Sequence, residues 1–144
     1  MKILITGCNS FLGKEICNSF LTKKHTLMPT NRVILDVSNP SDVEKILSKH
    51  NFDAVIHTAI SGGRRNRKDT FSDFLNNLRM FENLINNSDK YGTLFNFGSG
   101  AEFNRIKGVK DAKESDKSEF MPLDYYGISK NIISYRRLRQ NTRS

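Results

Sequence analysis

The sequence lacks tryptophan and contains only two cysteines, three prolines and no long apolar run. The cysteines, Cys8 and Cys17, show neither CxxC spacing nor an accompanying histidine cluster, which excludes a disulfide framework and predicts a reducing compartment, the cytoplasm. No apolar run approaches the roughly 18 residues that a membrane-spanning helix needs. The chain opens directly on a predicted strand, without the pattern of a signal peptide. We therefore expect a cytoplasmic chain with no membrane span and no metal centre.

Acidic residues are also scarce. Asp and Glu number 15 against 23 Lys and Arg, which gives a formal net charge of +8. Such an excess suits a nucleic acid, a membrane surface or a polyanionic small ligand. The basic residues are densest at 64–68 and 135–143, and neither segment carries the aromatic signature of an RNA-binding motif. The charge favours a soluble protein that binds phosphate groups, or simply a basic surface, over a specific nucleic-acid partner.

A chain of 144 residues is long enough for one domain. Short apolar runs rich in β-branched residues alternate with amphipathic segments along its length. The predicted strands are 2–6, 25–30, 32–37, 52–60 and 93–100, and the predicted helices are 13–23, 39–50, 71–91 and 124–139. This alternation predicts an α/β fold, a doubly wound parallel sheet of Rossmann type with about five strands. We expect residues 1–134 to form this domain and residues 135–144 to be a basic tail of the last helix.

The segment TGCNSFLG, residues 6–13, lies between the first strand and the first helix. Gly7 permits a tight turn there, and Gly13 lets the helix pack closely against the sheet. Ser10 stands where a dinucleotide-binding turn usually has its middle glycine. Its Cβ crowds the approach of a phosphate, but its hydroxyl can donate to a phosphate oxygen. The position of the turn makes it a candidate pyrophosphate site, with a plain βα turn as the alternative.

The end of the second strand normally selects between NAD and NADP. An acidic side chain there binds the ribose hydroxyls of NAD, whereas an arginine pairs with the 2′-phosphate of NADP. Residues 25–35 contain no Asp or Glu but do contain Asn31 and Arg32, which favours NADP over NAD. A solvated surface arginine is the alternative for Arg32. Asp36 can accept from the adenine amino group or cap the next helix.

The segment YYGISK carries Tyr126 and Lys130, four residues apart on the last predicted helix and therefore on one face. A phenol has a pKa near 10, and a neighbouring ammonium stabilises its ionised form. The pair is a candidate proton donor and acceptor for a carbonyl or carbinol, although an ordinary helical pair has the same spacing. Ser99 follows the last predicted strand, where α/β sheets place their ligands, and can donate a hydrogen bond to a substrate oxygen.

With these motifs together, the chain resembles the extended short-chain dehydrogenase/reductase family. It is most similar to the nucleotide-sugar epimerases, dehydratases and 4-keto reductases, in the branch of dTDP-4-dehydrorhamnose reductase and GDP-fucose synthase. The resemblance extends to about residue 133. The matching segments are TGCNSFLG, LDVSNPSDV, FDAVIHTAI, NLRMFEN, NFGSGAEF and PLDYYGISK.

The resemblance implies hydride transfer between NAD(P) and a sugar carbon of a nucleotide sugar, and it is compatible with a homodimer. It assigns the catalytic roles to Ser99, Tyr126 and Lys130. Together with Asn31 and Arg32 at the end of the second strand, it implies a set of cofactor-binding residues on the turns after the strands and on the last helix: Gly7, Ser10, Phe11, Leu12, Gly13, Asp36, Val37, Thr58, Ala59, Ile60, Tyr126 and Lys130.

Members of the family continue past the Tyr–Lys helix into a further strand and a small domain that binds the sugar nucleotide, whereas this sequence ends at Ser144. We therefore expect a truncated member: a fragment, a frameshift product or a cut chain that lacks the substrate domain. Because remote substrate contacts orient the reacting groups, cofactor binding should survive while turnover is weak or absent. A non-catalytic NADP-binding or partner-binding module is the alternative function.

Overall fold

The computed structural model describes residues 1–64, 66–104, 113 and 121–141, with side chains described as far as residue 136. The chain divides into two compact units. The first comprises Met1–Ile60 and Arg79–Phe97, and the second comprises Ser61–Leu78 and the described part of Gly98–Ser144.

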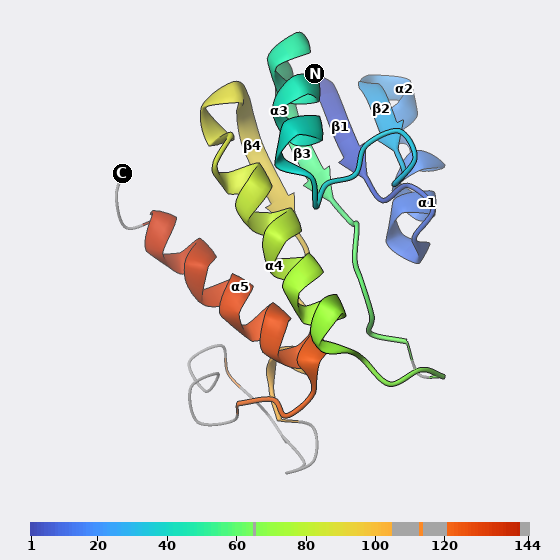
Figure 1. The fold of residues 1–144 in the computed structure, drawn as a ribbon. Coiled ribbons are helices and arrows are strands. Elements are labelled where there is room, and N and C mark those ends of the chain that lie inside the picture. The colour runs from blue at the N-terminus through green and yellow to red at the C-terminus, as the bar shows by residue number, and fades with distance from the viewer. Residues whose placement is uncertain (65, 105–112, 114–120, 142–144) are drawn as a thin grey trace. The chain divides into compact units, whose positions relative to one another are not determined.

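The first unit contains a parallel sheet built from all four strands of the described residues (Figure 1). The strands are β1 (Lys2–Thr6), β2 (Thr26–Thr30), β3 (Phe52–His57) and β4 (Tyr91–Asn96), in the spatial order β2-β1-β3-β4. In this register Thr6 lies beside both Thr30 and His57, so the strands end together at one edge. The prediction of a parallel Rossmann-type α/β fold is confirmed.

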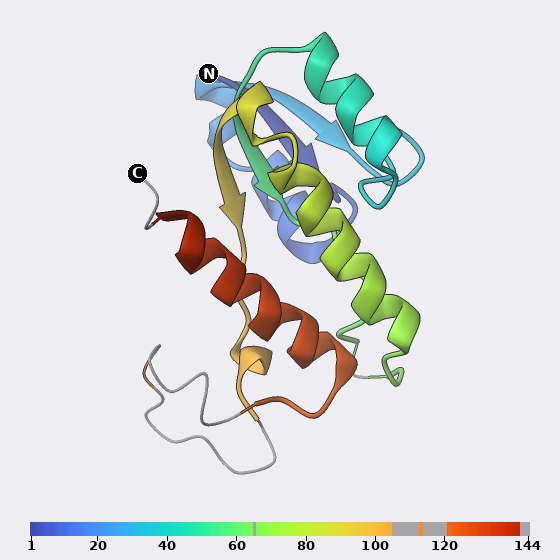
Figure 2. The same ribbon diagram turned by 60° about the vertical axis from the view of Figure 1, so that its left-hand side comes forward.

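Helices of the first unit cover both faces of this sheet. On one face, Leu4 and Val55 pack against Val43 and Leu47 of α3 (Pro40–Lys49) and against Leu84 of α4 (Phe71–Ile85), as Figures 1 and 2 show for these helices. The opposite face presents its own apolar cluster to α1 (Phe11–Cys17), with its members at alternate strand positions: Ile3, Ile5, Ala54 and Ile56. Successive strand residues point to opposite faces, so a continuously apolar strand is buried on both sides.

The remaining elements are short except for the last helix. They are α2 (Leu21–Lys24), η1 (Ser88–Lys90), η2 (Gly100–Glu102) and α5 (Tyr125–Asn141). The predicted helix over 13–23 is divided in two, α1 and α2. The chain turns between them at Ser19, whose hydroxyl donates to the carbonyl of Ile16 at 2.7 Å. A side-chain hydroxyl that binds a nearby carbonyl in this way competes with regular helix hydrogen bonding.

The prediction of a strand over 32–37 is wrong, and the described sheet has four strands rather than about five. The side-chain oxygen of Asn31 accepts from the N–H of Val33 at 2.9 Å, and its carbonyl accepts from the N–H of Leu35 at 2.9 Å. An Asx hydrogen bond of this kind bends the chain into a turn. Val33 is consequently 96% exposed while Leu35 is 3% exposed, although a strand would place both on one face.

This turn yields a test by paired substitutions. Leu35→Ala should lower the free energy of unfolding by about 2–5 kcal/mol, because it leaves a cavity in the core. Val33→Ala should change it by less than about 0.5 kcal/mol, because that side chain is in solvent. Urea unfolding followed by circular dichroism measures both values. Equal losses in the two variants would support the strand instead.

Candidate functional site

The glycine turn at the end of β1 packs against the backbone that follows β3. Gly7 has φ +72°, and a Cβ added there would lie 2.5 Å from the backbone N and Cα of Ala59. A Cβ on Gly13 would contact the carbonyl oxygen of Gly7 and lie 2.8 Å from Oγ1 of Thr58. Neither position has room for a side chain. The two glycines therefore have the roles expected of them, one in the tight turn and one in the close packing of α1.

Ser10 is the N-cap of α1. Its hydroxyl oxygen accepts from the N–H of Gly13 at 3.0 Å, and its hydrogen is directed to Oγ1 of Thr58 at 3.1 Å. Thr58 in turn donates to the carbonyl of Thr6 at 2.7 Å. The serine that replaces the middle glycine thus stabilises the start of the helix, as an N-cap hydroxyl does.

The exposed side of the turn is formed by Phe11 and Leu12, the first two residues of α1. Their side chains are exposed, and their backbone N–H groups have no acceptor within the helix because they belong to its first turn. These groups are the donors that an anion at this turn would meet. The sequence analysis expects both residues to be cofactor contacts, and this stays a prediction.

The turn after β2 carries the polar residues expected near an adenosine. Nε of Arg32 lies 3.3 Å from a carboxylate oxygen of Asp36, and the arginine side chain is 79% exposed. Asp36 also accepts from the N–H and hydroxyl of Ser38, at 3.0 and 2.6 Å. The hydroxyl of Ser38, with smaller effects from its N–H and Arg32, lowers the pKa of Asp36. Asp36 is therefore ionised at neutral pH.

The other residues expected around the cofactor differ in exposure. The side chain of Val37 belongs to the core, and its carbonyl accepts from the amide of Asn83 at 2.9 Å. Thr58 is buried and Ile60 is exposed. The first unit thus gathers Gly7, Ser10, Gly13, Thr58 and Ala59, because β1 and β3 are neighbours that end at the same edge of the sheet.

Ser99 begins the short helix η2 in the second unit. Its hydroxyl oxygen accepts from the N–H of Ala101 at 3.2 Å, and its own N–H donates to Oε1 of Glu102 at 2.9 Å. This reciprocal arrangement is a capping box. The capping box holds the Ser99 side chain in one orientation. Because the hydroxyl oxygen is the acceptor in the bond from Ala101, the hydroxyl hydrogen can still be donated to a substrate.

Tyr126 and Lys130 lie one turn apart on α5, in the same unit as Ser99. The helix begins where Asp124 accepts from the N–H of Gly127 at 2.7 Å. Burial lowers the pKa of the Lys130 ammonium, while the carboxylate of Glu102 opposes this effect. The ring of Tyr126 packs against loop 61–70, where a Cβ on Gly63 would lie 3.0 Å from its Cε2 atom.

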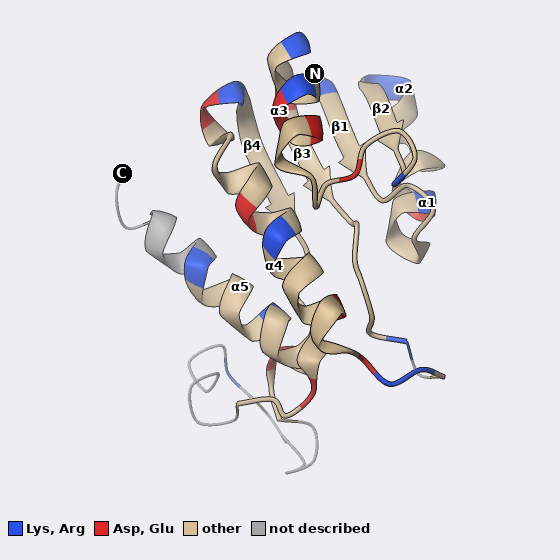
Figure 3. Ribbon diagram, in the orientation of Figure 1, with Lys and Arg blue, Asp and Glu red and all other residues tan. Residues whose placement is uncertain are grey.

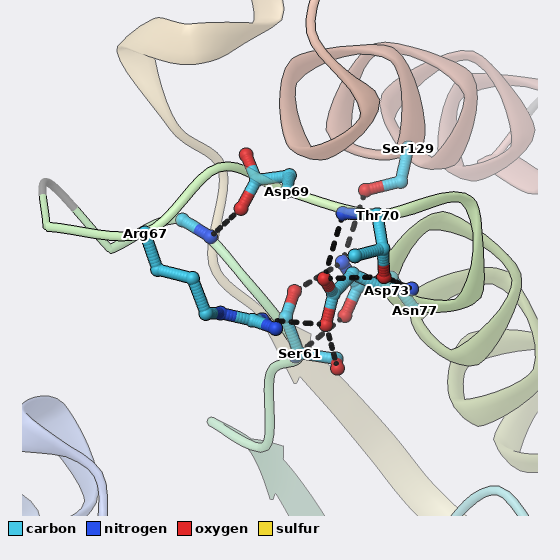
Figure 4. Close-up of polar contacts among 8 residues, drawn as sticks. Ser61, Arg67, Asp69, Thr70, Asp73, Asn77 and Ser129 are labelled. Atoms are coloured by element: carbon cyan, nitrogen blue, oxygen red, sulfur yellow. Dashed lines mark hydrogen bonds and ion pairs between the residues drawn. The ribbon is translucent and has the colours of Figure 1, made fainter.

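Loop 61–70 is held by a buried carboxylate, Asp73, at the start of α4 (Figure 4). Its oxygens accept from the Ser61 hydroxyl at 2.6 Å, from the Thr70 N–H at 2.9 Å and from the Arg67 guanidinium at 2.8 Å. The Ser61 hydroxyl is the main reason why the pKa of Asp73 lies far below its usual range, with the Thr70 N–H and Arg67 adding to it. These bonds hold Ser61, Arg67 and Thr70 of the loop against the start of α4.

Asn77 joins this loop to α5 (Figure 4). Its amide oxygen accepts from the N–H of Ser61 at 2.8 Å, and its amide nitrogen donates to the carbonyl of Ser61 and to the hydroxyl of Ser129, at 2.9 and 3.1 Å. The hydroxyl of Ser129 donates to the carbonyl of Tyr126 at 2.7 Å. A chain of polar contacts thus runs from the loop to the helix that carries Tyr126.

The sequence analysis did not identify Asp73 or Glu102 as residues of the site. A signal existed for each. Thr70 and Asp73, like Ser99 and Glu102, have the spacing of the capping-box pattern, in which Ser or Thr is followed three residues later by an acidic residue. The pattern reports the local cap but not the burial of the carboxylate.

The basic residues are distributed over several elements, including α2, α3, α4, α5 and loop 61–70 (Figure 3). Of the two dense basic segments, Arg65 and residues 142–144 lie outside the described residues. In the described part of the chain, no cluster of His, Cys, Asp and Glu could hold a metal ion. No helix there is both long and apolar enough to cross a bilayer.

The buried Asp73 predicts a pH-dependent stability. Asp73→Asn should lower the free energy of unfolding at neutral pH by about 1–3 kcal/mol, because buried donors lose their acceptor. Since folding lowers the pKa of Asp73, its contribution is present above the usual value of about 3.9 and disappears as the pH falls below it. The difference from the wild-type chain should therefore shrink in acid.

Urea unfolding at several pH values measures this difference, and Asp89→Asn, at an exposed position in η1, is the control. A difference that stays constant from neutral to acidic pH would contradict the role given to the Asp73 charge.

Comparison with known proteins identifies a family and related enzymes for this chain. The model of the NAD dependent epimerase/dehydratase family matches residues 3–136. The GDP-6-deoxy-D-talose 4-dehydrogenase of Aggregatibacter actinomycetemcomitans is 28% identical, over 94% of this chain and 47% of the relative. The chain thus spans about half the length of this curated relative.

Solved structures agree in fold. A GDP-D-glycero-L-gluco-heptose synthase from Campylobacter jejuni, solved in the presence of NADPH, is 25% identical with a TM-score of 0.81, over 92% of this chain and 41% of that chain. A GDP-L-fucose synthetase from Naegleria fowleri, bound to NADP, is 20% identical with a TM-score of 0.82, over 99% of this chain and 48% of that chain. The expected resemblance to nucleotide-sugar enzymes is confirmed.

Proposed function

The chain belongs to the NAD dependent epimerase/dehydratase family, and we propose that it is the NADP-binding part, within residues 1–134, of an enzyme that transfers hydride at a sugar carbon of a nucleotide sugar. The observation that carries the proposal is the glycine turn, whose two side-chain-free positions bring α1 against the end of β3. A cytoplasmic location accords with the two free cysteines.

The residues of the turn fit a dinucleotide. Gly7 and Gly13 give the backbone the tight path of a pyrophosphate-binding turn. The N–H groups of Phe11 and Leu12 are the donors available to a phosphate oxygen, while Ser10 holds the start of the helix. When bound, the nicotinamide supplies or accepts the hydride.

Arg32 supports NADP as the preferred cofactor. Its guanidinium is exposed and its ion pair with Asp36 is at the surface, where such pairs contribute little to stability. The arginine can therefore exchange Asp36 for a 2′-phosphate at small cost. A doubly charged phosphate binds a guanidinium through charge-assisted hydrogen bonds, which are stronger than neutral ones.

In the proposed reaction Tyr126 moves the proton of the sugar hydroxyl. Lys130 lies one helical turn away on α5 and supplies a positive charge to the catalytic group. Ser99 is held by its capping box, and its hydroxyl hydrogen stabilises the substrate oxygen as charge develops on it. A GDP-sugar is the proposed substrate class, since the relatives named above act on GDP-sugars.

The cofactor assignment is tested by titrating the chain with NADPH and with NADH, followed by nucleotide fluorescence. We expect tighter binding of NADPH. Arg32→Ala should weaken NADPH binding by about tenfold, the equivalent of one charged hydrogen bond, and leave NADH binding unchanged.

Lys45→Ala is the matched control, since it removes one exposed positive charge from α3. An equal loss of NADPH affinity in both variants would reduce the role of Arg32 to general charge. Tighter binding of NADH than of NADPH by the wild-type chain would refute the NADP preference.

The catalytic assignment is tested by measuring NADPH-dependent turnover with a panel of 4-keto GDP-sugars. Tyr126→Phe should reduce any turnover by about 10²–10⁴-fold, because the proton donor is lost while the ring remains. NADPH binding should change far less. Wild-type rates in Tyr126→Phe would exclude the proposed proton transfer.

A further inference from the structure

Glu102 is an ionisable side chain that is almost completely buried. It is only 4% exposed, and a carboxylate is rarely buried to that extent unless it has partners. One of its oxygens accepts from the N–H of Ser99 at 2.9 Å. The same oxygen lies so close to Gly98 that a Cβ there would be 2.8 Å away. The carboxylate is thus fixed against the backbone that presents Ser99.

The helix α5 packs on Glu102 from the other direction. The amide of Asn131, which is 1% exposed, donates to the carbonyl of Glu102 at 2.9 Å. Lys130 is the neighbour of Asn131 on that helix, and the Glu102 carboxylate raises the pKa of its ammonium against the lowering effect of burial. The buried carboxylate of Glu102 therefore acts on two of the three catalytic candidates: it binds the N–H of Ser99 and raises the pKa of Lys130.

We propose that Glu102 is a positioning residue for the catalytic group, which fixes the backbone of Ser99 and acts as the counter-ion of Lys130. This inference rests on the proposed function, since it concerns the same group of residues. Burial alone favours a neutral amine, whereas an opposite charge nearby favours the ammonium. Glu102 thereby extends to higher pH the range in which Lys130 carries its positive charge.

Other ionisable groups of the second unit are held by partners of their own. Asp73 accepts from Arg67, Asp69 accepts from the N–H of Gly63, and Asp124 caps α5. Besides Lys130, the ionisable side chains in the described part of the second unit are Arg64, Arg67, Lys68, Asp69, Asp73, Glu102, Lys113, Asp124, Tyr125, Tyr126, Tyr135 and Arg136. The carboxylate of Glu102 acts on the titration of Lys130 by raising its pKa.

The experiment is an NMR titration of the lysine side chains in the complete chain, with the Lys130 signal assigned from Lys130→Arg. Glu102→Gln is the informative variant, because glutamine can also complete a capping box and so retains the acceptor for Ser99 while removing the charge. We expect the titration midpoint of Lys130 to move to lower pH in Glu102→Gln.

The matched control is Glu44→Gln, which removes one exposed carboxylate from α3 and should leave the Lys130 midpoint unchanged. Glu102→Asp keeps the charge but withdraws it by one methylene, and it should lower the midpoint by less than Glu102→Gln. If Glu102→Gln does not fold, as judged by circular dichroism, the comparison of Glu102→Asp with the wild-type chain decides the outcome.

An unchanged Lys130 midpoint in the Glu102 variants would overturn the inference, as would an equal displacement in Glu44→Gln. The titration requires neither cofactor nor substrate. A chain that fails to bind NADPH but shows the displaced midpoint would therefore refute the proposed function while retaining the coupling of Glu102 to Lys130. A chain that binds NADPH, but whose Lys130 midpoint does not move in Glu102→Gln, would retain the proposed function and refute the coupling of Glu102 to Lys130.

Discussion

The close approach of the glycine turn to the backbone after β3 is the constraint on which the first unit depends. Because β1 and β3 are hydrogen-bonded neighbours in register, the residues that follow them meet at one edge of the sheet. A side chain at Gly7 or Gly13 would collide with Ala59 or Thr58. With both positions bare, Ser10 can cap α1 and bind Thr58, and the N–H groups of Phe11 and Leu12 have no acceptor within the helix.

The second unit is organised around buried carboxylates rather than around a sheet. Asp73 collects donors from loop 61–70, and Glu102 secures the backbone of Ser99. Buried carboxylates are tolerated only when donors or cations compensate for lost hydration. That requirement makes the loop and η2 well defined. The result is a preorganised polar frame around the helix of Tyr126 and Lys130, which suits a reaction that depends on placed donors and charge.

Much of this arrangement could be predicted, and the failures have specific causes. Strands β1 and β3 were evident because burial on both faces requires continuous apolar residues. The segment 32–37 has an equally apolar composition, but the Asx hydrogen bonds of Asn31 bend it into a turn. Asp73 and Glu102 were missed because an acidic residue in a polar segment is usually solvated. Their burial results from the packing of α4, loop 61–70 and α5.

The sequence by itself determined the alternation of strands and helices, the positions of the two glycines and the spacing of Tyr126 and Lys130, since these depend on local periodicity and backbone freedom. Tertiary structure decided which residues that are far apart in the sequence come into contact. It directed the Ser10 hydroxyl to Thr58, joined Asn77 to Ser129 and brought Asn131 to the carbonyl of Glu102. The energy of a charge depends on its desolvation and its partners, and both are determined only when distant segments pack together.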